Sequence, residues 1–105
     1  MEAKSIDAGE FRSGQRQQWD TAATGWRKWN DLIDRAASGI SDRLVELAGV
    51  APGARVLDVA AGYGEPSLTA ARAVGSDGKV VATDISAEML AYGRERAGAA
   101  GIENI

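Results

Sequence analysis

The sequence contains neither cysteine nor histidine among its 105 residues. Without cysteine there can be no disulfide and no thiolate metal site, which fits a reducing cytoplasm. Without histidine, a Ser-His-Asp triad, a histidine general base and the usual zinc sites are excluded. We therefore predict no metal site and a cytoplasmic location.

Long apolar runs and an excess of positive charge are also absent. No apolar segment approaches the roughly 18 residues of a membrane-spanning helix, and the N-terminus has no apolar core of a signal peptide. The net charge of −3 gives no electrostatic attraction for nucleic acid. With 45% hydrophobic residues, the composition is that of one small soluble domain without a membrane or nucleic-acid partner.

Residues 10–50 have a helical pattern. Gly25 and the Ser38-Gly39 pair interrupt it, so we expect two or three helices, the last with Ser41 as its N-cap. We expect the tryptophans of this segment mainly in the core, with Trp29 as the candidate to cap a ligand pocket. One apolar stripe with spacings of three and four supports the helical prediction: Trp19, Ala22, Trp26, Trp29 and Ile33.

The second half of the sequence alternates strands and helices. Residues 55–59 (RVLDV) and 79–83 (KVVAT) are predicted strands. The first is apolar without alternation, which is typical of a strand buried on both faces in a parallel sheet. Helices are predicted at 66–74 and, after Ser86 as N-cap, at 87–100. Two strands joined by a helix form a right-handed parallel crossover, so the fold class is α/β.

A glycine loop joins the first strand to its helix in the stretch VLDVAAGYGEP, residues 56–66. Gly62 and Gly64 allow the backbone to approach a ligand closely, and the free N–H groups of the first helical turn point toward it. About 20 residues later the second strand ends in Asp84, where an acidic side chain can accept hydrogen bonds from two ribose hydroxyls. The combination predicts a nucleoside site.

The residues around the loop argue against a diphosphate. The third small position of the nicotinamide fingerprint is occupied by Ser67, and Glu65 places a negative charge where a pyrophosphate would lie. No Gly-Lys-Ser/Thr of a Walker loop follows. S-adenosylmethionine carries a positive charge and no phosphate, and Asp58, four residues before Gly62, fits that cation better than any phosphate.

The stretches VLDVAAGYGEPSLTAA and GKVVATDISAEMLAYGRERA closely resemble the first two motifs of the Rossmann-like (class I) S-adenosylmethionine-dependent methyltransferases. Within them the sequence looks most like the ubiquinone/menaquinone C-methyltransferases and many small-molecule methyltransferases. WDTAATGWRKWNDL is more loosely similar to their helical N-terminal preface. The resemblance implies a methyltransferase for a small-molecule acceptor, with a helical segment at 1–50 and a partial cofactor lobe, a βαβα half of the family sheet, at 51–105.

The resemblance also implies a set of cofactor contacts. Two positions depart from the family pattern: Ala60 stands where a glycine is common, and Tyr63 where a small residue or threonine is common. Tyr63 is therefore expected to line the pocket or narrow its mouth, and no residue is assigned as a general base. The remaining contacts follow the motifs: Asp58, Ala60, Gly62 and Gly64 around the methionine moiety, Asp84 on the ribose hydroxyls, and Ile85 and Met89 against adenine.

Other interpretations of single residues stay open. Asp58 could instead accept backbone N–H groups of the loop, because a carboxylate in a buried strand is costly unless it is paired. Met89 could serve helix-to-sheet packing alone. Residues 94–96 (RER) are expected to form a solvated helix face.

The family sheet has seven strands, and this sequence supplies two. We therefore expect an amino-terminal lobe, either of a truncated or cleaved enzyme or of a half-domain that forms a homo-oligomer through the free edge of the 55–59 strand. Two other function classes remain open. One is a non-catalytic nucleoside-binding or self-associating module. The other is an NAD-binding βαβ unit, against which Ser67 and Glu65 count.

Overall fold

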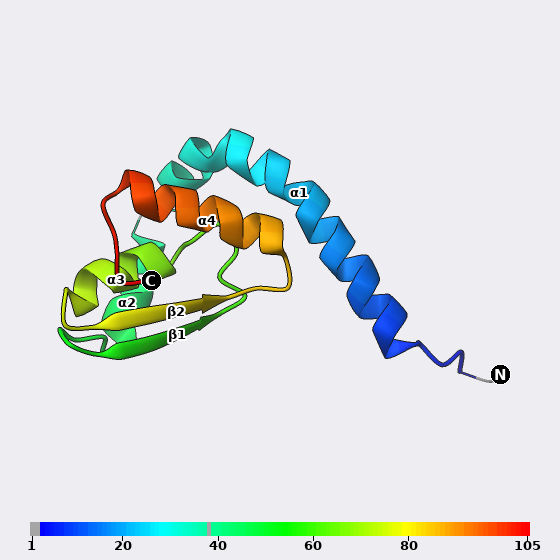
Figure 1. Ribbon diagram of the computed structural model, residues 1–105, viewed down its shortest axis with the longest axis horizontal. Coiled ribbons are helices and arrows are strands. Elements are labelled where there is room, and N and C mark those ends of the chain that lie inside the picture. Colours follow the sequence, from blue (N-terminus) through cyan, green and yellow to red (C-terminus); the bar gives the residue numbers. More distant parts are fainter. Residues whose placement is uncertain (1–2, 38) are drawn as a thin grey trace.

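The computed structural model describes residues 3–37 and 39–105. A helical preface precedes a βαβα unit, as predicted (Figure 1). The elements in chain order are α1 (Ala8–Ala36), α2 (Ile40–Leu47), β1 (Arg55–Val59), α3 (Ser67–Val74), β2 (Lys79–Thr83) and α4 (Ala87–Ala99).

The two strands pair in parallel, with α3 as the crossover between them. The register places Arg55 beside Lys79 at one end of the sheet and Val59 beside Thr83 at the other. Because the strands run in the same direction, the loops that follow them leave the sheet at the same edge. This arrangement confirms the α/β class and brings the glycine loop next to the segment that contains Asp84.

The core lies between α3 and one face of the sheet, and α4 lies over that same face (Figure 1). The centre of this core consists of Ala70, Ala71, Val74 and Val80. The other face is open: Leu57 is 65% and Val59 is 71% exposed. The prediction that β1 is buried on both faces was therefore wrong, because within the described residues the helices cover one face only.

Helix α1 runs through Gly25 without a break, which corrects the predicted interruption. A single glycine costs a helix only about 1 kcal/mol relative to alanine. The helix begins after Asp7, whose carboxylate accepts the N–H of Glu10. Helix α2 has Gly39 as its N-cap, in the left-handed region at φ 87°, so Ser41 lies inside the helix and is not its cap. Ser38, predicted as part of this break, lies outside the described residues.

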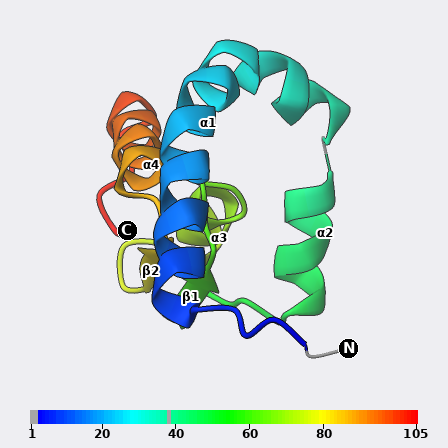
Figure 2. The same ribbon diagram turned by 90° about the vertical axis from the view of Figure 1, so that its right-hand side faces the viewer.

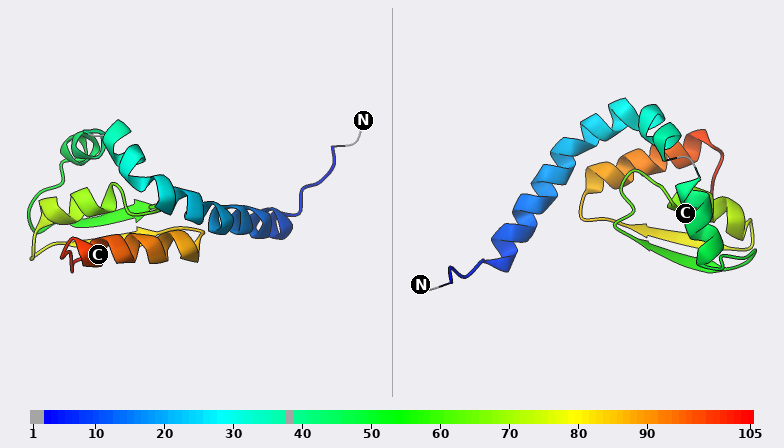
Figure 3. Two further views of the ribbon diagram at one scale, coloured as in Figure 1. Left: turned by 90° about the horizontal axis from the view of Figure 1, so that it is seen from above. Right: turned by 180° about the vertical axis from the view of Figure 1, so that it is seen from behind.

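The N-terminal part of α1 projects away from the sheet, and its later turns lie beside α4 (Figures 2 and 3). Among the described residues of α1, Ala23 alone is buried. Trp19 is 42% and Trp29 is 53% exposed. The expectation that the tryptophans pack mainly in the core was therefore wrong for these two, and polar contacts take a large part in holding α1 to α4.

The segment after α4 returns to the free edge of β2. Gly101 follows the end of α4 and has φ 69°. The backbone carbonyl of Asn104 accepts the N–H of Val80 at 2.8 Å, and its side-chain amide donates to the carbonyls of Ala71 and Gly75 at 2.9 and 2.8 Å. Asn104 thereby fixes this segment against both the sheet and α3.

Candidate functional site

The glycine loop and the end of β2 are joined by hydrogen bonds. The N–H of Ala61 donates to the carbonyl of Thr83 at 2.8 Å. One carboxylate oxygen of Asp84 accepts the N–H of Gly62 at 2.9 Å, and the other accepts the N–H of Ser86 at 2.8 Å. Each carboxylate oxygen has two lone pairs, so both retain capacity for a ligand hydroxyl.

The loop needs backbone conformations that favour glycine. Gly62 has φ 56° and Gly64 has φ 117°, and the second value is accessible almost only to glycine. Ala60 has φ 59° and carries the steric cost of a side chain in the left-handed region. A further glycine lets α4 approach the loop: a Cβ on Gly93 would lie 3.3 Å from the carbonyl carbon of Tyr63.

An open cavity of about 570 Å³ lies beside this loop, within the size range of sites for small ligands. Six of the eight predicted cofactor residues line it: Ala60, Gly62, Tyr63, Asp84, Ile85 and Met89. Asp58 and Gly64 are not part of its lining. The lining includes two acidic residues, Glu65 and Asp84, and, among the residues the structure describes, no lysine or arginine. The carboxylate of Glu65 accepts a hydrogen bond from the hydroxyl of Thr69 at 2.7 Å.

Asp58, in β1, lies beside Ser67, the first residue of α3. Its carboxylate accepts a hydrogen bond from the hydroxyl of Ser67 at 2.5 Å, and Ser67 is 1% exposed. The described partner of Asp58 is thus a side-chain hydroxyl and not a backbone N–H of the loop. In the sequence, Ser67 stands where the nicotinamide fingerprint has a glycine or alanine. This residue was the signal for the pair with Asp58, because a buried serine hydroxyl needs a hydrogen-bond partner.

The wall of the cavity opposite the sheet comes from α1. Trp19 and Trp26 line it, and Trp29, the residue expected to cap the pocket, does not. Trp26 stacks on Tyr63 with ring centroids 5.3 Å apart, and Tyr63 lies 6.5 Å from the ring of Tyr92. The spacing of seven residues between Trp19 and Trp26, two helical turns, was the signal that could have identified this pair.

Tyr63 is held by charged groups on both helices. Its hydroxyl donates to Asp34 at 3.0 Å, and its backbone carbonyl accepts a bond from Arg96 at 3.2 Å. Arg96 also pairs with Asp34. Burial raises the pKa of the Tyr63 phenol to about 12, and the hydrogen bond to Asp34 and the charge of that carboxylate act in the same direction. The expectation that residues 94–96 form a solvated face was therefore wrong for Arg96.

Three more polar contacts fasten α1 to the start and middle of α4. The hydroxyl of Ser86 donates to Asp20 at 2.5 Å and accepts the N–H of Met89 at 3.1 Å, which confirms Ser86 as the N-cap. Arg16 donates to the carbonyl of Ile85 at 3.3 Å. Arg27 forms an exposed ion pair with Glu95.

The sequence model of the ubiE/COQ5 methyltransferase family matches residues 17–105. The chain belongs to this family. A ubiquinone/menaquinone biosynthesis C-methyltransferase UbiE of Teredinibacter turnerae is 45% identical over 71 residues, which are 63% of this chain and 28% of that protein. Its counterpart in Legionella pneumophila (strain Corby) is 34% identical over 94 residues, 89% of this chain and 38% of that protein. The chain thus spans 28% to 38% of the length of these two relatives.

Solved structures agree with membership of the ubiE/COQ5 family. A SAM dependent methyltransferase from Aquifex aeolicus has a TM-score of 0.57 and 33% identity, covering 61% of this chain and 34% of that chain. A protein-L-isoaspartate O-methyltransferase also has a TM-score of 0.57, with 29% identity, covering 62% of this chain and 20% of that chain. The fold is therefore a partial Rossmann-like α/β fold of the methyltransferase type.

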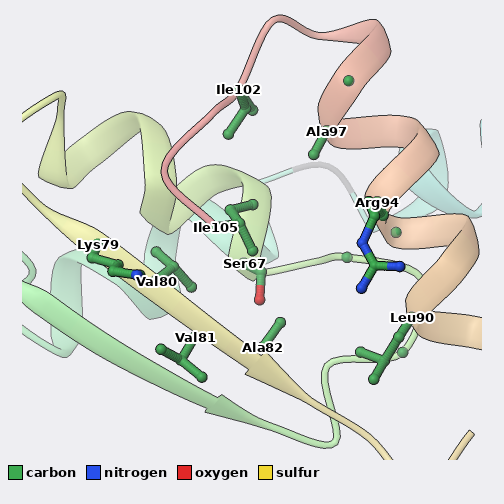
Figure 4. Close-up of a pocket in the computed structure, with 14 residues that line it drawn as sticks. Ser67, Lys79, Val80, Val81, Ala82, Leu90, Arg94, Ala97, Ile102 and Ile105 are labelled. Atoms are coloured by element: carbon green, nitrogen blue, oxygen red, sulfur yellow. The ribbon is translucent and has the colours of Figure 1, made fainter. Parts of the chain in front are cut away.

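A second cavity, of about 460 Å³, lies between β2, α4 and the C-terminal segment (Figure 4). Val80, Ile102 and Ile105 give it an apolar character, and Gly62 and Gly64 also line it. Asp84 lines the first cavity and is not part of this lining.

Residues 3–37 and 39–105 contain no group of three or more acidic, histidine or cysteine side chains that could hold a metal ion. They also contain no helix with the length and hydropathy needed to cross a membrane.

Proposed function

We propose that this chain provides the S-adenosylmethionine-binding part of a methyltransferase that acts on a small-molecule acceptor. The observation that carries the proposal is Asp84, which bridges the glycine loop and the start of α4 at the edge of a cavity of about 570 Å³. Membership of the ubiE/COQ5 family supports it. In this proposal residues 51–105 form the cofactor lobe and residues 1–50 the helical segment that walls it.

The charges around the cavity fit this cofactor. Its lining includes two acidic residues, Glu65 and Asp84, and no cationic residue among the described ones. A pyrophosphate would be repelled by such a lining, whereas a sulfonium is attracted to it. This is also the reason that an NAD-binding function is not favoured.

The residues around the cavity suggest how each part of the cofactor is held. The free lone pairs of Asp84 would accept hydrogen bonds from the two ribose hydroxyls, and the apolar side chains of Ile85 and Met89 would pack against adenine. The backbone of Gly62 would lie along the methionine moiety. Asp58 and Gly64, which lie outside the lining, would support the loop from below through Ser67 and α4.

S-adenosylmethionine supplies an electrophilic methyl group, so a methyltransferase works largely by holding that group in line with its acceptor. This chain's contribution is placement: Asp84 and the loop fix the nucleoside, and Trp19 and Trp26 shield one side of the cavity from water. We assign no general base to the described residues.

Calorimetric titration with S-adenosylhomocysteine tests the proposal. We compare the wild type with Asp84→Ala and, as a matched acidic control, with Asp77→Ala, because Asp77 lies in the exposed turn at the opposite end of the sheet. Loss of the acceptor for two hydroxyls should weaken binding by about 2 to 4 kcal/mol. Equal affinity of all three proteins, or no binding by the wild type, would contradict the proposal.

A second proposal, which the open sheet supports, concerns assembly and not a different function. Leu57 and Val59 are exposed on the uncovered face, and a strand edge without a partner recruits another chain. We propose that the chain forms a homo-oligomer through the free edge of β1. We also propose a cytoplasmic location, because the sequence has no cysteine. A stable monomer in light scattering would exclude the oligomer.

A further inference from the structure

Tyr63 is the one residue of the segment Gly62–Gly64 that has a side chain, and it is held on four sides. Its hydroxyl donates to Asp34 of α1, and its carbonyl accepts a bond from Arg96 of α4. The guanidinium carbon of Arg96 lies 4.6 Å from the centre of its ring, and Trp26 stacks on it. The loop is therefore fixed to both helices through one residue.

Arg96 makes two of these links and also pairs with Asp34, which makes a third. It donates to the Tyr63 carbonyl, pairs with Asp34 and lies over the Tyr63 ring. Only the flat, forked guanidinium can combine these contacts, since a lysine ammonium is a single point charge. The side chain of Arg96 is 15% exposed, so its pair with Asp34 is screened less by solvent than an exposed pair.

The glycines on either side of Tyr63 cannot fix the loop by themselves. Gly62 and Gly64 adopt positive φ values and have no side chain to pack. Backbone hydrogen bonds hold part of the loop, from Gly62 to Asp84 and from Ala61 to Thr83, but glycine residues keep more conformational freedom than any other residue. The anchor at Tyr63 adds the side-chain contacts that the two glycines cannot make.

We propose that Asp34 and Arg96 are positioning residues, which hold the glycine loop in its ligand-binding arrangement by clamping Tyr63 between α1 and α4. The inference rests on the proposed function, because it takes the loop as the cofactor loop. The two residues need not touch the cofactor. Their effect passes through Tyr63 to Gly62, and through Trp26 to the wall of the cavity.

The test compares two ways of weakening the contact between α1 and α4. Asp34→Asn and Arg96→Gln break the clamp, and Arg96→Lys is the conservative variant. The matched control is Arg27→Gln, which removes an exposed ion pair with Glu95 between the same two helices and a contact over the ring of Tyr92, neither of which involves a loop residue. For each protein we measure the affinity for S-adenosylhomocysteine and the amide hydrogen exchange of Gly62 and Gly64.

Clamp variants should bind S-adenosylhomocysteine about tenfold more weakly and exchange the two glycine amides faster, with Arg96→Lys in between. Arg27→Gln should leave both quantities unchanged. Equal effects of Asp34→Asn and Arg27→Gln would overturn the inference, because any contact between the two helices would then hold the loop equally well. If the wild type does not bind, the proposed function fails. The amide exchange still decides the inference, and unchanged exchange in the clamp variants overturns it.

Discussion

The carboxylate of Asp84 accepts a hydrogen bond from the N–H of Gly62, 22 residues earlier in the chain. Its other oxygen accepts the N–H of Ser86. One side chain thus satisfies a donor in each of the two loops that leave the carboxyl edge of the sheet. The residue that we propose for ribose binding is also the residue that joins the two loops.

This double role predicts a loss of stability in the absence of ligand. Asp84→Ala leaves the N–H groups of Gly62 and Ser86 without their described acceptor, which should lower the free energy of unfolding by about 1 to 3 kcal/mol. Denaturation in urea measures the change. Asp77→Ala, in an exposed turn, should stay within about 0.5 kcal/mol of the wild type. Equal stability of the two variants would contradict the bridging role.

A second prediction concerns the alanine at φ 59°. Ala60→Gly removes the cost of a side chain in the left-handed region, about 1 to 2 kcal/mol, but adds freedom to the unfolded chain, about 0.4 to 1 kcal/mol. The net result should be a gain in stability of up to about 1.5 kcal/mol. The neighbouring Ala61→Gly is the control: Ala61 is buried, without a positive φ, and its substitution should destabilise the protein. Chemical denaturation compares the two, and a loss of stability in Ala60→Gly would show that the strain is negligible.

A third prediction concerns Gly78, where an added Cβ would come closer to its neighbours than at any other glycine of the chain. A Cβ on Gly78 would lie 2.3 Å from the Cβ of Val74 and 2.7 Å from the carbonyl oxygen of Ala54. Gly78→Ala must therefore displace the turn before β2, at a cost of about 1 to 3 kcal/mol. Gly98→Ala, at a helical position with nothing within 4 Å, should instead stabilise the protein by up to about 1 kcal/mol. The midpoint temperature of thermal unfolding should fall in Gly78→Ala and rise in Gly98→Ala. A shift of both midpoints in the same direction would be inconsistent with this packing.

A fourth prediction follows from the phenol of Tyr63, whose pKa is raised from 10.0 to about 12. Between these values the folded protein keeps a proton that the unfolded chain has lost, so the free energy of unfolding falls as the pH rises from 10 to 12. Below pH 10 this contribution is fully present. Ultraviolet titration of the phenolate in a Tyr92→Phe background reports Tyr63 alone.

The matched variant for this titration is Asp34→Asn, which removes the negative charge beside the phenol. The pKa of Tyr63 should fall, because in the wild type the hydrogen bond to the Asp34 carboxylate and its negative charge both raise that pKa. A midpoint that stays the same in Asp34→Asn would show that the carboxylate does not act on Tyr63 in solution.

The sequence by itself determined the local structure of residues 55–105, but it wrongly predicted a break at Gly25 and a helix cap at Ser41. The bounds of both strands, the cap at Ser86 and the glycine loop could be predicted, because apolar runs, caps and positive φ values depend on neighbours within a few residues. The carboxylate of Asp84 could also be predicted, since its distance from the loop is set by one strand–helix–strand unit.

Only the tertiary structure decided which distant side chains meet. Tyr63 and Arg96 are both hydrogen-bonded to Asp34, which lies 29 and 62 positions away in the sequence. No periodicity relates such positions. For the same reason Trp26 faces the cavity while Trp29 is exposed, since the rotation of α1 about its axis is fixed by its contacts with α4. Helical spacing predicts a stripe, but the partner helix determines which residues of that stripe are covered.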